Sequence, residues 1–423
     1  MRVTHLSTYD LAGGAARAAY RLHVGLRSIG HDSHFLALYK SSDDPTVLQF
    51  DPPRDISARI RRGLRRRYLS RCAAEFPSRT KDSTLFSDDR SQHGGDVLRR
   101  IPKSDVLNLH WVAGFIDYGA FFRRLPPSLP LIWTLHDMNP FTGGCHYDGG
   151  CSKFAQECGT CPQLGSSGPG DLSSQIWRRK HRAYSRKGVQ RPHVVAPSRW
   201  LADEARKSSL FSECPTSVIP YGIDTTSFQP RNRVVARQKL GVPPEAKTIL
   251  FVADWAGEER KGLEVFLEAT KGLESAGGFL FLAIGRDWGS HSLDARFRKI
   301  GFLSDETDLS FVYSAADVFV IPSLQDNLPN TVLEALACGV PTVGSRVGGI
   351  PDMVRDSSTG LLVPPRDPIA LRDALTSLFV ESGRLESMSK LCRQIAVQEY
   401  SLETQARRYE ELYRGLLGSG PQR

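Results

Sequence analysis

The stretch IPSLQDNLPNTVLEALACGVPTVGSRVGGI, residues 321–350, contains the signals that decide the fold. It predicts a short apolar strand over 318–321, a polar loop, a helix that begins near Pro329, and a second strand from Pro341. Gly339 is typical of a helix C-terminus. One face of the helix is apolar and would pack on a sheet; it consists of Val332, Leu333, Leu336 and Ala337. This order of elements is half of a doubly wound α/β sheet.

Two carboxylates lie at the loop and the first turns of this helix, Asp326 and Glu334. Ligands of open α/β sheets bind beyond the carboxyl ends of the strands. A helix N-terminus there favours a phosphate, because its N–H groups are free and its dipole end is positive. Glu334 can accept hydrogen bonds from a vicinal diol such as a ribose, and Asp326 can reach groups beyond the phosphates. For either residue alone, the alternative is an ordinary surface carboxylate.

The segment PSLQDNLPNTVLEALACGVPTV, residues 322–343, resembles the signature of retaining glycosyltransferases of family 4. Asp326 stands where that family's first glutamate is usual, and Glu334 matches the second. The polar loop is similar to a branch associated with bacterial exopolysaccharide assembly, the colanic-acid type. The resemblance implies an α/β chain of the GT-B fold, with two Rossmann-like doubly wound domains facing each other across a cleft.

Length and composition limit the number of domains, the cellular compartment and the kinds of partner that we expect. The 423 residues suffice for two domains. No stretch approaches the roughly 18–20 apolar residues of a membrane span, and the N-terminus lacks the apolar core of a signal peptide, so we expect a cytoplasmic protein. The net charge of +9 favours anionic partners such as nucleotide sugars and phospholipid head groups. No nucleic-acid-binding motif is visible.

The domain boundary is expected at residues 220–230. The segment VIPYGIDTTSFQP resembles the family's interdomain crossover, with Gly222 and Asp224 in its turn. The expected domains are residues 1–220, completed by a C-terminal helix over 402–417, and residues 221–401, which would bind the nucleotide sugar. Residues 360–368 resemble the family's edge hairpin.

The first domain contains two glycines and two histidines where ligands are expected. Gly13 and Gly14 open a helix after the first strand, and they allow a ligand to approach the backbone; the alternative is a tight βα turn. His110 and His136 each follow a buried-type strand. The resemblance implies that the glycine loop faces the diphosphate or the acceptor and that His110 lies beside the transferred sugar, whereas His136 orders the acceptor side of the cleft.

Residues 54–71 carry eight arginines and one aspartate. At helical spacing they form a rough apolar stripe, which consists of Ile56, Ile60, Leu64, Tyr68 and Leu69. A basic amphipathic helix is typical of a membrane-surface element, and the alternative is a solvated helix. If the acceptor is lipid-linked, residues 56–71 would hold the enzyme at an anionic membrane surface, peripherally at the inner membrane.

Half of the eight cysteines lie within 17 residues, in an insertion over 143–165. Clustered thiols in the cytoplasm suggest metal binding rather than disulfides, and four thiolates can bind one zinc tetrahedrally. The candidate ligands of a structural zinc are Cys145, Cys151, Cys158 and Cys161. The alternatives are reduced structural thiols or disulfides. No cofactor is expected for catalysis.

Cations that can neutralise a diphosphate follow a strand in the second half. Lys261-Gly262 fits the family's motif, whereas the arginine expected five positions before Lys261 is replaced by Ala256, and Arg260 is the candidate substitute. A diphosphate that leaves without a metal needs such cationic stabilisation. The resemblance implies that the backbone at Phe302 and Leu303 contacts the base. The remaining donor contacts are expected at the helix start, from Asn327, Leu328 and Asn330.

Together these features predict a metal-independent glycosyltransferase, a hexosyltransferase, that uses a nucleoside-diphosphate sugar and a saccharide acceptor. Asp326, Glu334, His110 and Lys261 would carry the chemistry. Since no nucleophile is obvious, retention would follow from front-face attack, in which the leaving phosphate accepts the acceptor's proton. The absence of Asp-x-Asp argues against a metal-dependent transferase, and the absence of G-x-G-x-x-G argues against a dehydrogenase. A nucleotide-sugar epimerase of the same fold and a non-catalytic nucleotide-binding scaffold are the alternatives.

Overall fold

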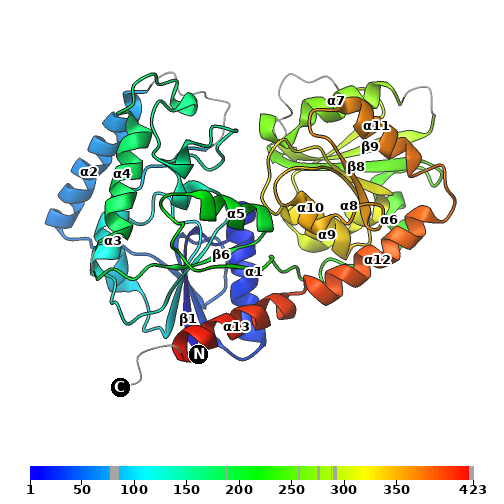
Figure 1. Cartoon of the computed structure of the whole chain (residues 1–423). Coiled ribbons are helices and arrows are strands. Elements are labelled where there is room, and N and C mark those ends of the chain that lie inside the picture. The colour runs from blue at the N-terminus through cyan, green and yellow to red at the C-terminus, as the bar shows by residue number, and fades with distance from the viewer. Residues whose placement is uncertain are drawn as a thin grey trace. The chain divides into compact units, whose positions relative to one another are not determined.

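The computed structural model describes residues 1–76, 85–186, 188–255, 258–273, 277–286, 288 and 293–418. The chain forms two compact units; in Figure 1 the first runs from blue to green and the second from green to orange-red, and the red C-terminal helix returns to the first. The N-terminal unit consists of Met1–Pro220 and Ala406–Arg423, and the C-terminal unit is Tyr221–Gln405. Each unit has a parallel sheet of its own with helices packed on it, so the expected pair of doubly wound domains is confirmed.

The N-terminal unit has a seven-stranded sheet in the order β3-β2-β1-β4-β5-β6-β7. The strands are β1 (Arg2–Tyr9), β2 (Asp32–Tyr39), β3 (Val47–Gln49), β4 (Val106–Leu109), β5 (Leu131–Thr134), β6 (His193–Ala196) and β7 (Thr216–Val218). Every pair is parallel, and Val3 of β1 lies between Ser33 and Val106. The strand order reverses between β1 and β4, which is where open α/β sheets bind ligands.

Helices α2 to α5 of this unit begin at polar N-cap residues. Ser198 accepts a hydrogen bond from the amide of Leu201, and Asp171 caps its helix in the same way by accepting from Ser174. This second helix therefore starts at Leu172. The α-helices are α1 (Gly14–Ser28), α2 (Ile56–Ala74), α3 (Tyr118–Arg124), α4 (Leu172–Tyr184), α5 (Arg199–Lys207) and α13 (Leu402–Gly418). Short 3-10 turns are η1 (Val97–Arg100), η2 (Asn139–Phe141), η3 (Lys153–Ala155) and η4 (Pro162–Leu164).

The C-terminal helix α13 completes the core of the N-terminal unit. Ala406, Tyr409 and Tyr413 are fully buried on the face that the sequence pattern selects. They pack in one apolar cluster with β-strand and α1 residues that include Val3, Leu22, Val106 and Ile132. The two tyrosine hydroxyls are satisfied there, since Tyr409 pairs with Thr134 at 2.9 Å and Tyr413 accepts from Asn108 at 3.0 Å. The described residues from Ala406 onward therefore belong to this unit.

The C-terminal unit has a six-stranded parallel sheet in the order β10-β9-β8-β11-β12-β13. The strands are β8 (Lys247–Trp255), β9 (Phe279–Arg286), β10 (Phe297–Gly301), β11 (Val318–Ile321), β12 (Thr342–Ser345) and β13 (Gly360–Val363). The order reverses between β8 and β11. The expected edge hairpin over 360–368 is wrong, because β13 pairs in parallel with β12 as the last strand of the sheet.

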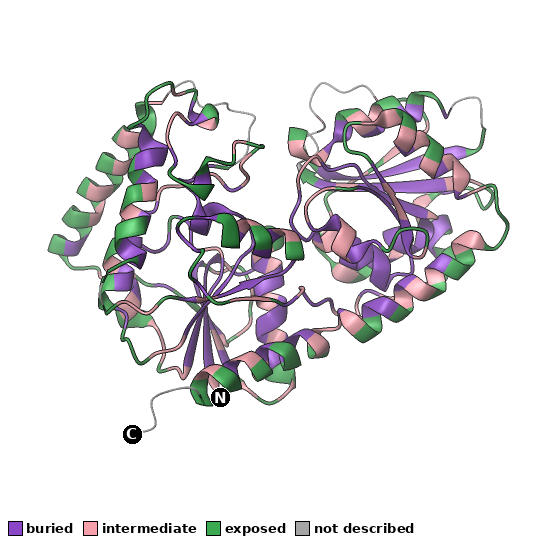
Figure 2. Ribbon diagram, viewed as in Figure 1, coloured by how far each residue is buried: buried purple, intermediate pink, exposed green. Residues whose placement is uncertain are grey.

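Helices cover this second sheet, and α9 is the most deeply buried of them in Figure 2. Its apolar face is the predicted one, with Val332, Leu333, Leu336 and Ala337 all fully buried. The helices are α6 (Arg233–Leu240), α7 (Leu263–Lys271), α8 (Glu306–Ala315), α9 (Asn330–Ala337), α10 (Ile350–Met353), α11 (Pro368–Ser377) and α12 (Arg384–Glu399), with the 3-10 turn η5 (Glu259–Lys261). None of the helices in the described part of the chain is long and apolar enough to cross a membrane.

Candidate active site

Two loops meet at the switch point of the C-terminal sheet, after β8 and after β11. Lys261 lies with its ammonium 2.8 Å from Oδ2 of Asp326, and Nη1 of Arg260 lies 3.4 Å from the same oxygen. Arg260 also donates to the carbonyl of Gln325 at 2.8 Å. Three residues that the sequence selected separately therefore form one charged cluster. Ala256, where the family's arginine was expected, lies outside the described residues.

The charge state of Asp326 follows from this cluster. The side chain is only 8% exposed. Burial on its own would raise the pKa of the carboxyl group, but the charges of Lys261 and Arg260 and the hydrogen bonds from Lys261 and the Asn327 amide outweigh it. The pKa of Asp326 therefore lies below its ordinary value, and the residue is a buried carboxylate paired with two cations at neutral pH.

Two glycines allow the Asp326 loop to pack closely. A Cβ atom at Gly348 would lie 1.7 Å from the Asp326 carbonyl oxygen, and one at Gly262 would lie 2.0 Å from the Pro322 carbonyl oxygen. Both glycines have positive φ angles, +54° and +73°. The Gly349 amide donates to the Asp326 carbonyl at 3.1 Å. A side chain at either position would displace the loop that carries Asp326.

The second carboxylate, Glu334, is held by a buried tyrosine. Glu334 lies on α9 and is 4% exposed, and its Oε2 accepts a hydrogen bond from the Tyr313 hydroxyl at 3.0 Å. Tyr313 is fully buried on α8, so it packs in the core of the unit and also orients Glu334. The sequence did not indicate this bond, because the contact depends on how α8 and α9 cross.

The N-terminus of α9 carries the other expected donor contacts. Asn327 and Leu328 are buried in the preceding loop, and Asn330 is the first residue of the helix. Pro329 takes the N-cap position and has no polar side chain to cap the first turn. Such an uncapped helix start can hold an anion with its backbone N–H groups.

The expected base contacts lie at the ends of two neighbouring strands. Phe302 and Leu303 directly follow β10, and Phe302 is 41% exposed. Its ring is covered by the guanidinium of Arg286 at the end of β9, 3.6 Å from the ring centroid. Arg286 lies 3.6 Å from Asp254 of β8. The sequence did not indicate Arg286 or Asp254, because only the strand order brings them to Phe302.

The N-terminal unit contains a chain of three hydrogen-bonded histidines. Nε2 of His110 lies 2.9 Å from Nδ1 of His5, and Nδ1 of His110 lies 3.0 Å from Nε2 of His136. Burial lowers the pKa of His136 to about 4 and that of His110 well below its ordinary value. All three rings are neutral at pH 7. Both nitrogens of His110 are engaged, so a substrate contact there would replace one of these bonds. The sequence did not indicate His5, which the pairing of β1 with β4 brings to this position.

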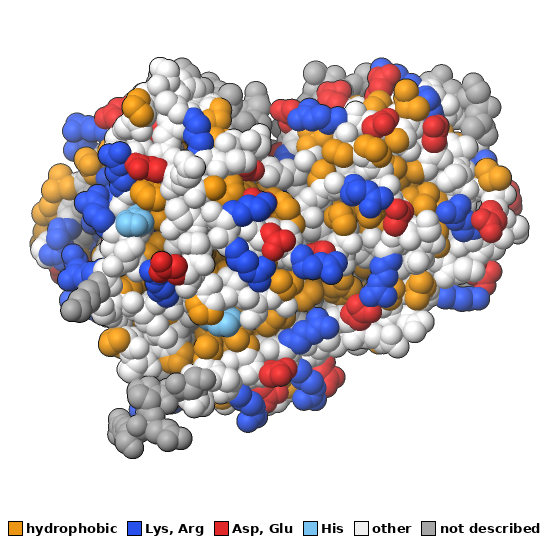
Figure 3. All heavy atoms as spheres, viewed as in Figure 1, with side chains coloured by type: hydrophobic (Ala, Val, Ile, Leu, Met, Phe, Trp, Pro, Cys, Tyr) orange, Lys and Arg blue, Asp and Glu red, His pale blue; other side chains and the backbone are white. Residues whose placement is uncertain are grey.

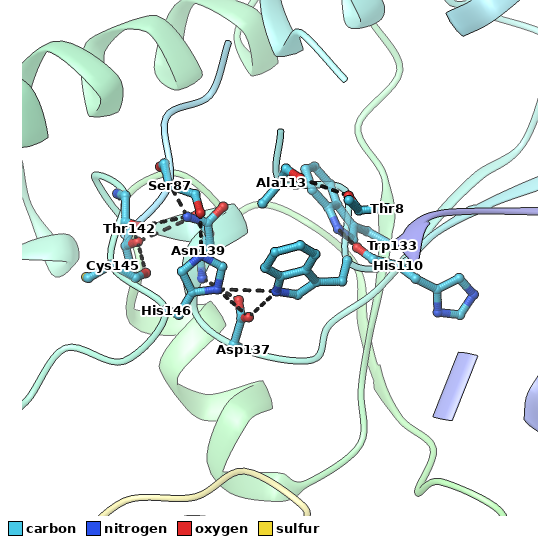
Figure 4. A network of polar contacts seen from close by, with 12 residues as sticks. Thr8, Ser87, His110, Ala113, Trp133, Asp137, Asn139, Thr142, Cys145 and His146 are labelled. Carbon is cyan, nitrogen blue, oxygen red and sulfur yellow. Dashed lines mark hydrogen bonds and ion pairs between the residues drawn. The ribbon is translucent and has the colours of Figure 1, made fainter. Parts of the chain in front are cut away.

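A second polar network joins these strand ends to the cysteine-rich segment (Figure 4). Asp137 Oδ2 accepts from the Trp111 indole N–H at 2.8 Å and lies 2.5 Å from Nδ1 of His146. The other nitrogen of His146 lies 2.9 Å from the Ser87 hydroxyl. Burial would raise the pKa of Asp137, but the interactions with His146, the Asn139 amide and Trp111 hold it below its ordinary value. The sequence did not indicate this network.

The glycine loop has free space beside it. Gly13 has a φ of +85° at the start of α1, and a Cβ atom there would have no neighbour within 4 Å. Gly14 is the first residue of the helix. The loop is held by the buried carboxylate of Asp10, which accepts from the amides of Ser41 and Ser42, both at 2.9 Å. A ligand could therefore approach the backbone of this loop closely, because no side chain fills the space beside Gly13.

The four clustered cysteines are free thiols and line one cavity, which is formed mainly by the chain segment that connects β5 to α4. In the described part of the chain, no three His, Cys, Asp or Glu side chains are already arranged as ligands of one metal ion. The structure therefore places the four predicted cysteines in the wall of one cavity, but their side chains are not arranged as ligands of a single metal ion.

Family models match both halves of the chain. Residues 12–227 match the model described as Glycosyltransferase Family 4, and residues 246–381 match Glycosyl transferases group 1. The chain belongs to glycosyltransferase family 4.

Curated relatives cover part of the chain. The lipopolysaccharide core biosynthesis mannosyltransferase LpsB of Rhizobium meliloti is 28% identical over 256 residues, which are 57% of this chain and 70% of the relative. A D-inositol 3-phosphate glycosyltransferase of Actinosynnema mirum is 34% identical over 202 residues, which are 43% of this chain and 48% of the relative. The match spans less than two thirds of such inositol-phosphate relatives.

Solved structures resemble the whole chain. Sucrose-phosphate synthase of Thermosynechococcus elongatus has a TM-score of 0.67 with 18% identity, and the match covers 99% of both chains. Anabaena HepE in complex with UDP-glucose has a TM-score of 0.66 with 14% identity, covering 98% of this chain and 100% of that one. With the two parallel sheets, these likenesses identify the α/β GT-B fold.

Proposed function

We propose that this protein transfers a hexosyl group from a nucleoside-diphosphate sugar to a saccharide acceptor, with retention of configuration and without a catalytic metal. The observation that carries the proposal is the cluster of Lys261, Arg260 and Asp326 at the switch point of the C-terminal sheet. It combines cations for a diphosphate with a carboxylate for sugar hydroxyls. Family membership and the UDP-glucose bound to the similar fold of HepE support the choice of donor class.

In the proposed mechanism, the chain's own residues bind and orient the donor. Lys261, Arg260 and the backbone N–H groups over 327–330 stabilise the departing diphosphate. Glu334, oriented by Tyr313, accepts hydrogen bonds from the ribose, and Phe302 and Leu303 contact the base. Asp326 contacts the sugar hydroxyls. The acceptor hydroxyl attacks the anomeric carbon on the face that the phosphate leaves, and a phosphate oxygen takes its proton.

The acceptor side is assigned to the N-terminal unit. Gly13 and Gly14 offer open backbone, and His110 with its partners His5 and His136 offers neutral imidazoles that can donate or accept. We assign the acceptor to the assembly of a bacterial exopolysaccharide or another cell-surface polysaccharide, in a lipid-linked form, on the cytoplasmic side of the inner membrane. The relative named for lipopolysaccharide core biosynthesis supports this assignment.

The exposed surface of α2 supports a peripheral membrane contact. Ile56, Ile60, Leu64 and Tyr68 are 76%, 57%, 63% and 55% exposed, whereas Ala58 is buried on the opposite face. Leu69 lies on that inner face, so its predicted place in the exposed apolar stripe is wrong. Hydrophobic and basic side chains lie together where α2 runs along the edge of the molecule (Figures 1 and 3). Such a helix can insert its apolar side chains between anionic head groups.

The test is a screen of the purified protein against UDP-, GDP- and ADP-sugars. Thermal stabilisation by one nucleotide class and slow release of its sugar are expected, both independent of added Mg²⁺ or Mn²⁺. Glu334→Gln should abolish the stabilisation, and Glu245→Gln, at an exposed position of the same unit, should retain it.

Two outcomes would replace the proposal. Formation of an epimeric donor without sugar release would assign the chain as a nucleotide-sugar epimerase. Nucleotide binding without sugar release or transfer to any lipid-linked or free saccharide would assign it as a nucleotide-binding scaffold.

A further inference from the structure

The cysteine-rich segment between β5 and α4 is not used by the proposed transfer reaction. Its four cysteines, spaced C-x5-C-x6-C-x2-C, line a single cavity whose wall includes the rings of Phe86 and Phe154. Nothing in the sugar-transfer mechanism requires four thiols at one place. The remaining four cysteines lie elsewhere in the chain, and they are Cys72, Cys214, Cys338 and Cys392.

A hydrogen-bond donor points at one sulfur atom of this cavity. The Gly143 amide donates to Sγ of Cys158 at 3.2 Å. A neutral thiol sulfur accepts a hydrogen bond only weakly. A metal-bound thiolate gains more from such a donor, because the donor disperses its negative charge.

A buried cation lies beside the cluster. Lys180 is fully buried, and its ammonium donates to the carbonyls of Asn139 and, at 3.1 Å, of Thr142. Burial lowers the pKa of Lys180 to about 8, whereas the negative charge of Asp89 raises it. Four thiolates around a divalent ion carry a net charge of −2. Lys180 supplies one compensating charge for such a centre.

We propose that Cys145, Cys151, Cys158 and Cys161 bind one divalent metal ion as four thiolates, with Zn²⁺ as the ion that this ligand set selects. The role is structural, since four protein ligands leave no open position for a substrate. The inference does not depend on the proposed transfer reaction.

Binding closes the site and releases protons. No three of the described side chains already form a ligand set, so the four cysteine side chains must turn onto the ion as it binds. Burial raises the pKa of Cys158 to about 11 and that of Cys161 above its ordinary value. Each Zn–S bond that forms from a thiol replaces one S–H bond, so one proton passes to the solvent for every cysteine that binds as a thiol.

The ion would stiffen the segment that reaches the strand ends of the N-terminal sheet. Thr142 donates to the Cys145 carbonyl at 2.7 Å, and Asn139 donates to the Gly144 carbonyl at 2.8 Å. His146, the residue after Cys145, contacts Asp137. A fixed Cys145 therefore fixes the partner of Asp137, which in turn holds Trp111 next to His110.

The test measures metal content and ligand type in the full-length protein. Protein purified without added metal should contain one zinc per chain by plasma mass spectrometry. After removal with a mercurial and a chelator, titration with Co²⁺ should give the intense visible bands of a tetrahedral thiolate site. Cys158→Ser and Cys161→Ser should lose the zinc, Cys158→His should retain part of it, and Cys72→Ser should be unchanged.

Two results would overturn this inference. One is a fully reduced, folded protein that contains no stoichiometric metal and shows no cobalt–thiolate bands after titration. The other is intact-mass evidence that the four cysteines form disulfides in freshly isolated protein. Nucleotide stabilisation of the C-terminal unit is measured in the same samples, so failure of the metal site and failure of the proposed transferase function are distinguished.

Discussion

The aspartate at position 326 is one methylene shorter than the glutamate usual in the family, and the structure shows what this side chain contacts. Its carboxylate lies 2.8 Å from the Lys261 ammonium and 3.4 Å from Arg260. In this state it therefore neutralises the cations that are proposed to hold the diphosphate. When the donor binds, Lys261 and Arg260 would interact with its phosphates as well as with Asp326.

Asp326→Asn should separate donor-nucleotide binding from sugar transfer. Without the negative charge, Lys261 and Arg260 are free for the phosphates, so the Kd of the nucleoside diphosphate should stay the same or fall. The transfer rate should drop by about 10²-fold, the loss typical of removing one polar contact to the reacting centre. Calorimetric titration measures the Kd of the nucleoside diphosphate, and initial rates measure sugar transfer. Asp373→Asn on exposed α11 is the control, and unchanged transfer by Asp326→Asn would contradict the role of Asp326.

Tyr313→Phe tests the orientation of Glu334. The substitution removes the hydroxyl that donates to Glu334 at 3.0 Å. Loss of one hydrogen bond to a charged group is worth about 1.5 kcal/mol, or roughly tenfold in donor affinity. Tyr409→Phe removes a buried hydroxyl from the N-terminal unit instead, so it should lower stability and leave the donor KM unchanged. Equal donor KM values for the wild type and Tyr313→Phe would show that the hydroxyl is not needed.

At the scale of the element, α2 presents its apolar stripe outward. Its inner side consists of Ala58, Arg62, Arg65, Leu69 and Cys72, all of which are less exposed than the stripe. Arg65 forms an ion pair with Asp117, the N-cap of α3, which ties the helix to the unit. Removing the outer side chains should therefore leave the fold intact.

Replacing Ile56, Ile60 and Leu64 by serine should abolish binding to vesicles that contain anionic lipid, because about 25 cal/mol per Å² of apolar burial is lost. Flotation with anionic and with neutral vesicles measures this. The matched control is Val234→Ser on α6, an equally exposed apolar residue of the other unit, which should float like the wild type. Flotation of the triple variant equal to that of the wild type would remove the membrane contact from the proposal.

At the scale of the whole molecule, the two units differ in their titratable groups. Ten of the eleven histidines lie in the N-terminal unit, and His291 is the exception. Burial lowers the pKa of His23, His93 and His136 to about 4 from an ordinary value of 6.5. These rings stay neutral in the folded state while the unfolded chain takes up protons.

The N-terminal unit should therefore lose stability as the pH falls from 6.5 towards 4. Above pH 6.5 the rings are neutral in both states and contribute nothing; below it the unfolded state binds more protons, which favours unfolding. At pH 5 each such histidine costs about 2 kcal/mol. Calorimetry at pH 7 and pH 5 should show one transition moving to lower temperature, while the nucleotide-stabilised transition moves less. His23→Gln should reduce the shift, and equal shifts of both transitions would contradict the assignment.

The sequence by itself determined the elements of each half and the candidate residues of the donor site. The period of Val332, Leu333 and Leu336 predicts a helix buried on a sheet, and the structure confirms it. Resemblance to the family's motifs also selected Lys261 and Asp326, whereas Arg260 was chosen as the neighbour of Lys261 that could replace the arginine missing at position 256.

Only the tertiary structure decided which residues meet. Strand order places His5 against His110, and the crossing of α8 and α9 places Tyr313 against Glu334. Neither contact has a local signal, because its partners are 105 and 21 residues apart in the chain. Likewise, the parallel pairing of β13 and the outward stripe of α2 depend on which surfaces the rest of the unit leaves open. Local sequence sets which element forms, whereas packing free energy, summed over distant residues, sets the contacts of each side chain.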